Sequence, residues 1–343
     1  MKKILLFSIL PLLFLACGSP VLHLKPIAQA HQFHIRGLEV SPEGTIWASG
    51  TEGTVIRSTN QGETWEHFQV PGADSLDFRD IEAFSSSEAM VLSAGSPAKI
   101  YHTTDAGQSW ELVYENNHPN IFLDGMDFNE AKQGVAYGDP IDSNFALIFY
   151  IDGKWDTLEH SLPSPLEGEA GFAASGTGVI CEGNNIWIAT GGGLMARVLV
   201  GTFTEPNFHP ILLPMPSGEG RGIFSIAKNG DNMVAVGGAY LDSTNIKGTA
   251  VVSRNGGASW KKSLRPAFGY RSCAVALPFD GDKTFVACGR TGIDYTRDGG
   301  ITWQLLSTAG GYFTAASNGT KVYFAGRYGK MAVIDFADLE ELK

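Results

Sequence analysis

The sequence predicts an all-β protein in which seven four-stranded antiparallel sheets form a single β-propeller. Three observations predict this fold. An eight-residue turn motif occurs four times, seven short apolar segments each end at a glycine, and no stretch shows the 3.6-residue periodicity of an amphipathic helix. Repeats at intervals of about 40 to 50 residues are typical of blades that pack side by side around a ring.

The repeated motif has the composition of a tight hairpin turn that ends in tryptophan. Its copies read S-T-N-Q-G-E-T-W at 58–65, T-T-D-A-G-Q-S-W at 103–110, S-R-N-G-G-A-S-W at 253–260 and T-R-D-G-G-I-T-W at 296–303. They resemble the Asp-box, or BNR repeat, of sialidases and related propellers. Asp or Asn caps backbone amides in such a turn, glycine supplies a positive φ, and tryptophan packs between sheets. Because Asn replaces Asp in two copies, we interpret the motif as structural.

The spacing of the tryptophans gives the number of blades. Trp65, Trp110 and Trp155 are 45 residues apart, and Trp155 ends a shortened copy of the motif. Trp260 and Trp303 are 43 residues apart, and the gap of 105 residues before Trp260 fits two longer blades. The second strand of each blade is predicted at residues 45–50, 89–95, 134–138, 185–191, 233–237, 284–289 and 321–326.

The two ends of the chain are predicted to meet. The last blade begins near Gly311 and has no room for a fourth strand before Lys343, whereas residues 21–27 precede the first inner strand and fit no other blade. We therefore expect residues 21–27 to supply the outer strand of the last blade and close the ring. No proline-rich or charged linker divides residues 18–343, which we take as one domain.

The first residues have the pattern of an export signal. Lys2 and Lys3 precede an apolar stretch over 4–16, which is too short to span a bilayer, and Cys17 follows with Gly and Ser after it. This resembles the lipobox of bacterial lipoproteins. It predicts that residues 1–17 direct export and that Cys17 carries a lipid, as in a periplasmic or outer-envelope lipoprotein. The alternative is an ordinary cleaved signal with a chance cysteine.

Charge and composition narrow the range of partners. The chain has 25 Lys and Arg against 36 Asp and Glu, a net charge of −11, which disfavours nucleic acid and anionic headgroups as partners. Any contact with a membrane is therefore expected through the lipid alone. The histidines and cysteines show no metal-binding spacing, and the glycine-rich segments do not open helices, so the sequence predicts no metal and no cofactor.

Two cysteines are expected to lie opposite each other in the sixth blade. If Asp280 and Gly281 form a two-residue hairpin turn, Cys273 and Cys288 are paired positions on its two strands. Counting outward from that turn puts them at a hydrogen-bonded position, where the side chains are farther apart than at the alternate positions. We therefore predict two neighbouring buried thiols in place of a disulfide.

A group of arginines is predicted at one end of the axis. Alignment of the inner strands places four of them around it, and the loops between second and third strands add two more, giving Arg36, Arg79, Arg221, Arg271, Arg290 and Arg327. Guanidinium groups suit a carboxylate, a phosphate or an acidic peptide. The alternative is that each arginine pairs with an acid of a neighbouring blade, such as Asp80, Asp124 or Glu169, and closes the ring.

A catalytic function would require other residues. Asp124 and Glu169 begin adjacent blades and could form the carboxyl pair of a glycosidase, and Tyr270 lies beside Arg271 as a candidate nucleophile. The R-I-P signature of sialidases is absent, because the matching place reads I-R-G-L at 35–38.

Beyond the turn motif, several segments resemble a bacterial family related to the photosystem II stability and assembly factor. They read I-W-A-S-G at 46–50, L-D-F-R-D-I-E-A at 76–83, F-L-D-G-M at 122–126 and G-E-A-G-F-A-A-S at 168–175. The resemblance implies a seven-bladed propeller that assists or binds other proteins through an arginine-rich face. We expect a monomeric, non-enzymatic scaffold whose partner is an envelope protein or an acidic peptide or glycan. The alternative is a sialidase-like glycoside hydrolase that acts on acidic glycans.

Overall fold

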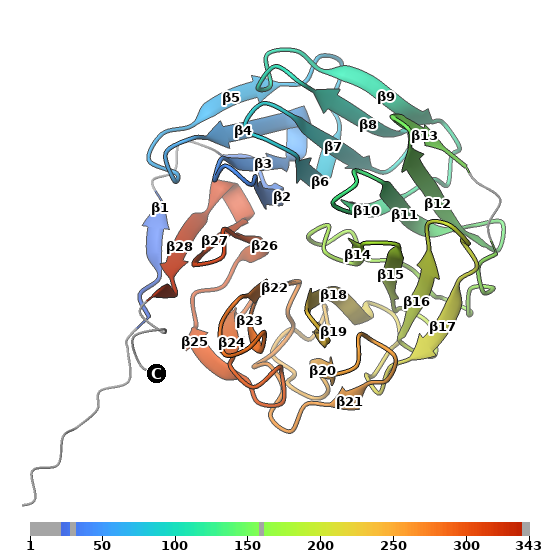
Figure 1. The fold of residues 1–343 in the computed structure, drawn as a ribbon, viewed down its shortest axis with the longest axis vertical. Helices are drawn as coiled ribbons and strands as arrows, with labels where there is room; N and C mark the ends of the chain where they lie inside the picture. The colour runs from blue at the N-terminus through green and yellow to red at the C-terminus, as the bar shows by residue number, and fades with distance from the viewer. Residues whose placement is uncertain (1–21, 28–31, 158–160, 338–343) are drawn as a thin grey trace, which may run out of the picture.

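The protein is a ring of seven four-stranded antiparallel sheets around a central axis (Figure 1). It is seen in a computed structural model that describes residues 22–27, 32–157 and 161–337. Each blade runs outward from an inner strand beside the axis to an outer strand at the circumference. The predicted seven-bladed propeller is therefore confirmed. The expected signal and Cys17 lie outside the described residues.

The strands follow one another through the blades in chain order. The first three blades contain β2 (Ile35–Val40), β3 (Ile46–Gly50), β4 (Thr54–Ser58), β5 (Glu66–Gln69); β6 (Asp77–Ala83), β7 (Ala89–Ala94), β8 (Ala98–Thr103), β9 (Glu111–Asn116); and β10 (Leu123–Phe128), β11 (Gly134–Ile141), β12 (Asn144–Ile151), β13 (Lys154–Asp156). The next two contain β14 (Val179–Glu182), β15 (Asn185–Thr190), β16 (Arg197–Thr202), β17 (His209–Leu212); and β18 (Arg221–Asn229), β19 (Asn232–Ala239), β20 (Ala250–Ser253), β21 (Lys261–Lys262). The last two contain β22 (Cys273–Leu277), β23 (Thr284–Gly289), β24 (Gly292–Thr296), β25 (Gln304–Ser307); and β26 (Tyr312–Ser317), β27 (Lys321–Gly326), β28 (Met331–Asp335), with β1 (Lys25–Ile27). All seven predicted second strands are present, as β3, β7, β11, β15, β19, β23 and β27.

The N-terminal strand closes the ring as predicted. Lys25, Pro26 and Ile27 of β1 pair with Val333, Ala332 and Met331 of β28, which makes β1 the outer strand of the seventh blade. The paired segment is shorter than the predicted 21–27. The side chain of Ile27 also lies close to Gly62 of the first blade. A Cβ atom added to Gly62 would be 3.2 Å from Cδ1 of Ile27.

The core consists of seven apolar clusters, and each lies between two neighbouring blades. The cluster between the first and second blades contains Trp47, Phe78 and Tyr101. The cluster between the sixth and seventh blades contains Val286 and Phe324. Valine, isoleucine and alanine on the first three strands supply most of these contacts, whereas the outer strands are largely exposed. Each blade is therefore stabilised by its neighbours.

The Asp-box turns use their polar residues within the turn. In the second blade, Asp105 Oδ1 accepts from Ser109 N at 2.8 Å, Thr103 Oγ1 accepts from Gly107 N at 3.0 Å, and Trp110 Nε1 donates to Gly107 O at 3.1 Å. Hydrogen bonds from Ser109 lower the pKa of Asp105. Gly107 has φ 90°. The aspartate is thus engaged as a turn former, as the sequence predicts.

The tryptophans of these turns are less uniformly buried than expected. Trp260 and Trp303 are buried, whereas Trp65, Trp110 and Trp155 are partly exposed while they pack on the core shared with the preceding blade. The turns lie at the outer part of each blade, where a neighbour covers the indole on one side. The backbone N of Trp303 donates to Arg265 O at 2.8 Å, which connects this turn to the segment that follows the outer strand of the fifth blade.

The cysteine pair has the predicted register. Cys273 pairs with Cys288, and both thiols are free and buried. The turn differs from the prediction, because the ladder ends at Leu277 and Thr284. Asp280, Gly281 and Asp282 all have positive φ, so the connection is a longer turn that preserves the same pairing.

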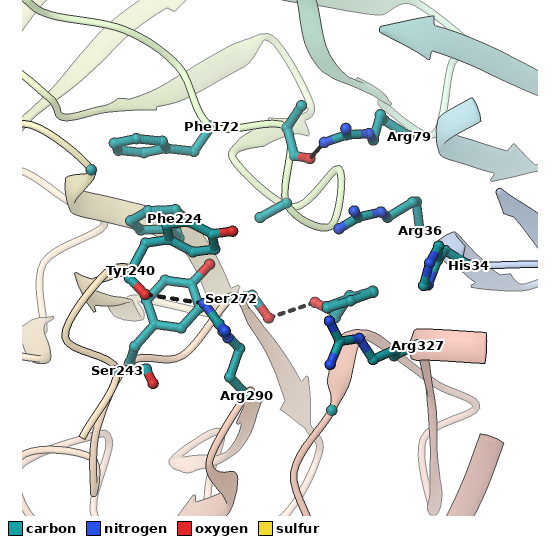
Figure 2. Close-up of a pocket in the computed structure, with 16 residues that line it drawn as sticks. His34, Arg36, Arg79, Phe172, Phe224, Tyr240, Ser243, Ser272, Arg290 and Arg327 are labelled. Carbon is teal, nitrogen blue, oxygen red and sulfur yellow. Dashed lines mark hydrogen bonds between the residues drawn. The ribbon is translucent and has the colours of Figure 1, made fainter. Parts of the chain in front are cut away.

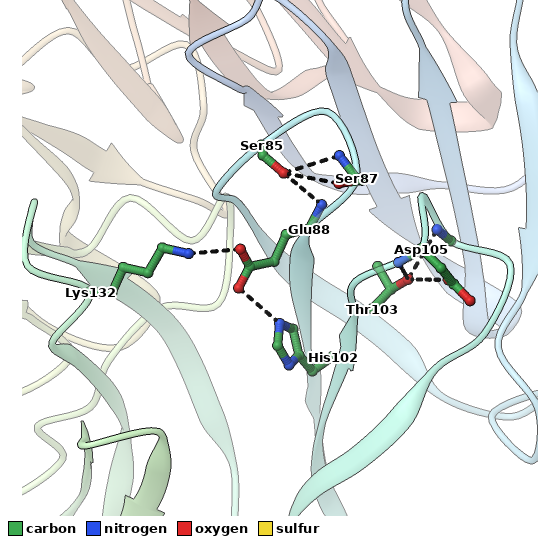
Figure 3. A network of polar contacts seen from close by, with 8 residues as sticks. Ser85, Ser87, Glu88, His102, Thr103, Asp105 and Lys132 are labelled. Atoms are coloured by element: carbon green, nitrogen blue, oxygen red, sulfur yellow. Dashed lines mark hydrogen bonds and ion pairs between the residues drawn. The ribbon is translucent and has the colours of Figure 1, made fainter.

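Polar contacts supplement the apolar clusters on the face that carries the Asp-boxes. Figure 3 shows Glu88 of the second blade accepting from Lys132 of the third at 2.7 Å and facing His102 at 3.3 Å. Ser85 Oγ accepts from the backbone N of Glu88 at 2.9 Å and so fixes the loop that carries it. Such exposed pairs contribute little free energy, and they orient the loops.

We expect Trp303→Ala to lower the free energy of unfolding by about 3 to 5 kcal/mol, because it empties a fully buried site between two blades. Trp110→Ala, at a partly exposed site, should cost less. Urea unfolding followed by circular dichroism measures both. Equal losses for the two variants would contradict the difference in burial.

Removal of residues 22–27 should lower the melting temperature and promote aggregation, because the edges of β28 and the first blade become exposed. Light scattering and thermal denaturation measure the effect. Lys25→Ala is the control, since it keeps the backbone pairing and should behave as the parent. A truncated protein as stable and monomeric as the parent would show that β1 does not close the ring.

Candidate functional site

Five inner strands contain a β-bulge near the end that faces one mouth of the axis. In each, the register with the second strand shifts around one extra residue. A bulge turns the side chain of the extra residue out of the regular alternation and is often found beside functional sites. The five bulged residues are Arg36, Arg79, Asp124, Phe224 and Phe313. All except Asp124 line one cavity.

This axial cavity has a volume of about 630 Å³ and two chemically different sides (Figure 2). Its basic side consists of His34, Arg36, Arg79 and Arg327. Its aromatic side contains Phe172, Phe224 and Tyr240, with Arg290 next to Tyr240. Tyr270, which also lines the cavity, belongs to this side because its ring contacts Phe224. The first, second and seventh blades supply the basic side, and the fourth to sixth supply the aromatic side. A ligand that spans the cavity would therefore meet positive charge at one end and aromatic rings at the other.

Arg79 is the one arginine of the cavity with an acidic partner among the described residues. Its Nε donates to Asp77 Oδ2 at 2.6 Å, and Nη1 donates to Ala173 O at 2.8 Å. No acid in the described ranges forms an ion pair with Arg36, Arg290 or Arg327. The alternative in which every arginine closes the ring by pairing with an acid of another blade therefore does not describe this site.

Arg36 is held by packing. Its guanidinium carbon lies 4.2 Å from the centre of the Phe313 ring, and its buried Nε has no acceptor among the described residues. Burial and then the charge of Arg79 lower the pKa of Arg36. Burial, Arg36 and Arg327 also lower the pKa of His34, which keeps the imidazole neutral at pH 7. A bound anion would relieve the repulsion among these groups.

The aromatic side is a set of rings in contact. Phe172 and Phe224 stack with centres 3.9 Å apart at 10°, and Tyr270 meets Phe224 edge-on at 4.7 Å. Tyr240 lies 6.0 Å from Tyr270, and the guanidinium of Arg290 lies 5.0 Å from the Tyr240 ring. Arg290 Nη1 also donates to Tyr240 O at 3.3 Å. These contacts give the cavity a rigid apolar wall.

Two arginines expected at the axis lie elsewhere. Arg271 is fully buried, where its Nε donates to Asp294 Oδ2 at 2.7 Å and Nη1 to Thr291 Oγ1 at 2.9 Å. Arg221 begins β18 and donates from Nη2 to Lys247 O at 3.2 Å. Neither lines the cavity. The prediction that Arg36, Arg79, Arg221 and Arg271 converge on one funnel is therefore wrong for the last two, while Arg290 and Arg327 do line it.

An alignment that starts the fifth inner strand at Arg221 misses the bulged residue Phe224, which lies three residues later. Hairpin register indicates the bulged position in four of the five strands, because the bulge there follows a residue that pairs with the glycine ending the predicted second strand, as Ile223 pairs with Gly237. In the second blade, Phe78 pairs with Ser93 instead. A count from that glycine would have revealed the aromatic side.

The proposed carboxyl pair is not assembled at the cavity. Glu169 is buried, accepts from Arg197 Nε at 2.8 Å and forms an ion pair with the same guanidinium. Asp124 is buried with Oδ2 unpaired within the described residues, and burial, then Asp139, raise its pKa well above the usual range. Tyr270 does line the cavity, but burial raises the pKa of its hydroxyl strongly, which disfavours a phenolate nucleophile.

The opposite mouth of the axis is acidic. A second cavity of about 410 Å³ is lined by the far ends of the inner strands and includes Glu39, Asp80, Glu82 and Asp127, with Glu130, Glu182 and Lys228 at its edge. Burial raises the pKa of Glu39 and of Asp127 to about 7, and it also raises the pKa of Asp80 and of Glu82 well above their usual range. No three His, Cys, Asp or Glu side chains in the described part of the chain are grouped to hold a metal ion.

Comparisons with known proteins agree with this architecture. Residues 43–121 match the family described as "Photosynthesis system II assembly factor YCF48", and residues 294–305 match the BNR/Asp-box repeat. The chain is an Asp-box β-propeller similar to the photosystem II assembly factors. Within the described residues, no helix is long and apolar enough to cross a membrane.

Curated relatives match over a short stretch. "Photosystem II stability/assembly factor HCF136, chloroplastic" of Oryza sativa subsp. japonica is 36% identical over 67 residues, and its counterpart of Arabidopsis thaliana is 30% identical over 67 residues. Each match covers 19% of this chain and 16% of the relative. The chain thus matches less than a fifth of the length of these relatives.

Solved structures match over nearly the whole chain. "YCF48 bound to D1 peptide" has a TM-score of 0.62 at 13% identity and covers 94% of this chain and 99% of its own. "YCF48 from Cyanidioschyzon merolae" has a TM-score of 0.61 at 15% identity, covering 92% and 99%. "Structure of U3-55K" has a TM-score of 0.64 at 12% identity, covering 91% and 98%. At these identities the likeness shows the fold alone.

The acidic cavity should make stability depend on pH. In the folded protein the pKa of Glu39 is raised from 4.5 to about 7, so ionisation of this carboxyl destabilises the fold. The loss in free energy of unfolding is absent below pH 4.5 and grows as pH rises to about 7. We therefore expect Glu39→Gln to be more stable than the parent at pH 8, by roughly 1 to 3 kcal/mol, and no more stable at pH 4.

Urea unfolding at the two pH values measures this difference. Glu111→Gln is the control, because Glu111 is exposed on an outer strand and should leave the pH profile unchanged. A Glu39→Gln variant whose advantage is the same at both pH values would show that the Glu39 carboxyl does not titrate as described.

Proposed function

We propose that this protein is a non-enzymatic binding or assembly factor that holds an acidic segment of another protein in its axial cavity. The observation that carries this proposal is a cavity containing Arg36, Arg79, Arg290 and Arg327, of which only Arg79 has an acidic partner among the described residues. The protein as a whole has a net charge of −11. Unpaired arginines in one cavity of an acidic protein suit carboxylates, which a guanidinium binds through two parallel hydrogen bonds.

The comparisons support a peptide or protein as the ligand. A propeller of the same fold is described as YCF48 bound to D1 peptide, and the curated relatives are described as stability or assembly factors. We propose the same kind of role for this chain, toward an acidic segment of another protein. The cavity volume of about 630 Å³ suits a few residues of an extended chain.

We favour binding over glycoside hydrolysis because none of the described residues that line the cavity carries a carboxyl group. A glycosidase of the usual kind needs two, about 5 to 9 Å apart and open to a sugar. Glu169 is held by Arg197, and neither Glu169 nor Asp124 lines the cavity. The raised pKa of the Tyr270 hydroxyl disfavours the sialidase type of nucleophile as well.

We also propose that the chain is exported and carried on a membrane by a lipid on Cys17, which would make the partner an envelope protein. The support is the sequence pattern of residues 2–19. Mass spectrometry of the protein isolated from its own cells would test this proposal through the mass of the N-terminal peptide.

The binding function is tested with a short fluorescent peptide that is rich in glutamate and has a free C-terminal carboxylate. We expect fluorescence anisotropy to show saturable binding that weakens with salt. Arg36→Gln and Arg327→Gln should each weaken it by about tenfold or more, because a hydrogen bond to a charged group is lost.

Arg265→Gln is the matched control, because Arg265 is exposed and lies outside the cavity. It should bind the peptide as the parent does, and all three variants should keep the parent's melting temperature. Equal binding by the parent, Arg36→Gln and Arg327→Gln would show that the peptide does not bind in the axial cavity and would contradict the proposed function.

A further inference from the structure

Exposed apolar side chains surround the aromatic side of the axial cavity. They lie on three loops of the fourth, fifth and sixth blades, at the same end of the axis as the cavity. We call them the apolar rim: Leu194, Met195, Tyr240, Leu241, Ile246 and Phe268. Leu194 and Leu241 are 81% and 78% exposed. Single exposed leucines are common on proteins, but a group of this size beside a cavity is typical of an interaction site.

The three loops are linked to one another and to the cavity. Gly192 N donates to Arg221 O at 3.0 Å, which connects the loop of the fourth blade to the fifth. A Cβ on Gly220, a cavity residue, would lie 3.8 Å from the Leu241 side chain. Ser243 O accepts from Tyr270 N at 2.9 Å, which connects the loop of the fifth blade to the sixth. The rim is thus continuous with the aromatic wall.

Arg221 and Arg271, the two predicted site arginines that do not line the cavity, hold two of these loops in place. Arg221 Nη2 donates to Lys247 O, next to Ile246. Arg271 Nη2 donates to Phe268 O at 3.4 Å, and its partner Asp294 accepts from Phe268 N at 3.0 Å. The loops are therefore fixed by their backbone while their apolar side chains face solvent. A surface ordered in advance loses little entropy when it binds.

We propose that the apolar rim and the basic side of the cavity form one bipartite site for an extended protein segment in which large apolar residues adjoin an acidic group. This rests on the proposed function and names the class of segment that the site takes. The carboxylate lies toward Arg36 and Arg327, where positive charge is unpaired among the described residues, and the apolar side chains lie over the fourth to sixth blades.

Such a segment would be buried in its own protein once that protein is folded or assembled, because adjacent large apolar residues are seldom left exposed together in the final state. The site therefore suits partners that are not yet assembled. Charge complementarity favours this direction of the segment, since Arg36 and Arg327 lie together on the basic side of the cavity.

Three labelled peptides of equal length test the proposal. The first peptide has leucine and phenylalanine followed by glutamates and a free C-terminus. The second has serines in place of the apolar residues. The third has glutamines in place of the glutamates and an amidated C-terminus. We expect the first to bind at least about tenfold more tightly than the second, because apolar surface is buried on the rim, and the third to bind most weakly.

Leu241→Ser combined with Phe268→Ser should remove the advantage of the first peptide and leave binding of the second unchanged. Leu264→Ser is the matched control, because Leu264 is 84% exposed but lies beside Ile301, in the Asp-box turn of the sixth blade. Melting temperatures of all variants confirm that the fold is intact.

Each other result overturns the inference in a distinct way. Equal binding of the first two peptides would show that the apolar rim does not contribute to binding, while the proposed function would still hold. Failure of all peptides would overturn both. Binding to vesicles of phosphatidylcholine with phosphatidylglycerol that is lost in the rim variant, without any preference for the first peptide, would assign the rim to a membrane surface.

Discussion

Apolar packing between neighbouring blades is the interaction on which the rest of this structure depends. Each of the seven clusters draws its residues from two adjacent sheets, so no blade has a core of its own. A ring of this kind is stable only when its first and last sheets are also in contact. The strand β1 satisfies that requirement, because it pairs with β28 while Ile27 packs toward the first blade. The axial cavities exist because this packing holds seven inner strands around a common axis.

The candidate site arises from irregularities within this regular frame. Regular strands would direct all side chains of the inner strands toward the neighbouring blades. Bulges at Arg36, Arg79, Phe224 and Phe313 turn four side chains toward the axis. The nearby loops are then fixed by buried polar groups such as Arg271 with Asp294. The stability of the ring and the chemistry of its mouth are therefore supplied by different residues, which allows one to vary without the other.

The sequence predicted the repeated parts of the molecule well because repetition multiplies a weak local signal. Four Asp-box turns, seven second strands and the pairing of Cys273 with Cys288 all follow from spacing. Side-chain direction at the axis was harder, because one bulge changes which residue faces the cavity. Arg36 and Arg79 were placed correctly, whereas Arg221 was three residues from the position that Phe224 occupies. The ion pair of Glu169 with Arg197 joins residues 28 positions apart, and no local pattern indicates it.

The two mouths of the axis carry opposite charge. Arginines surround one, and Glu39, Asp80, Glu82 and Asp127 surround the other. The charged groups at the two mouths therefore contribute a dipole along the axis of the ring, and this contribution increases as the acidic mouth ionises near and above pH 7. A negatively charged molecule that approaches in solution exerts a torque on such a dipole. The torque on this dipole favours an approach with the arginine mouth forward, and dissolved salt weakens the effect.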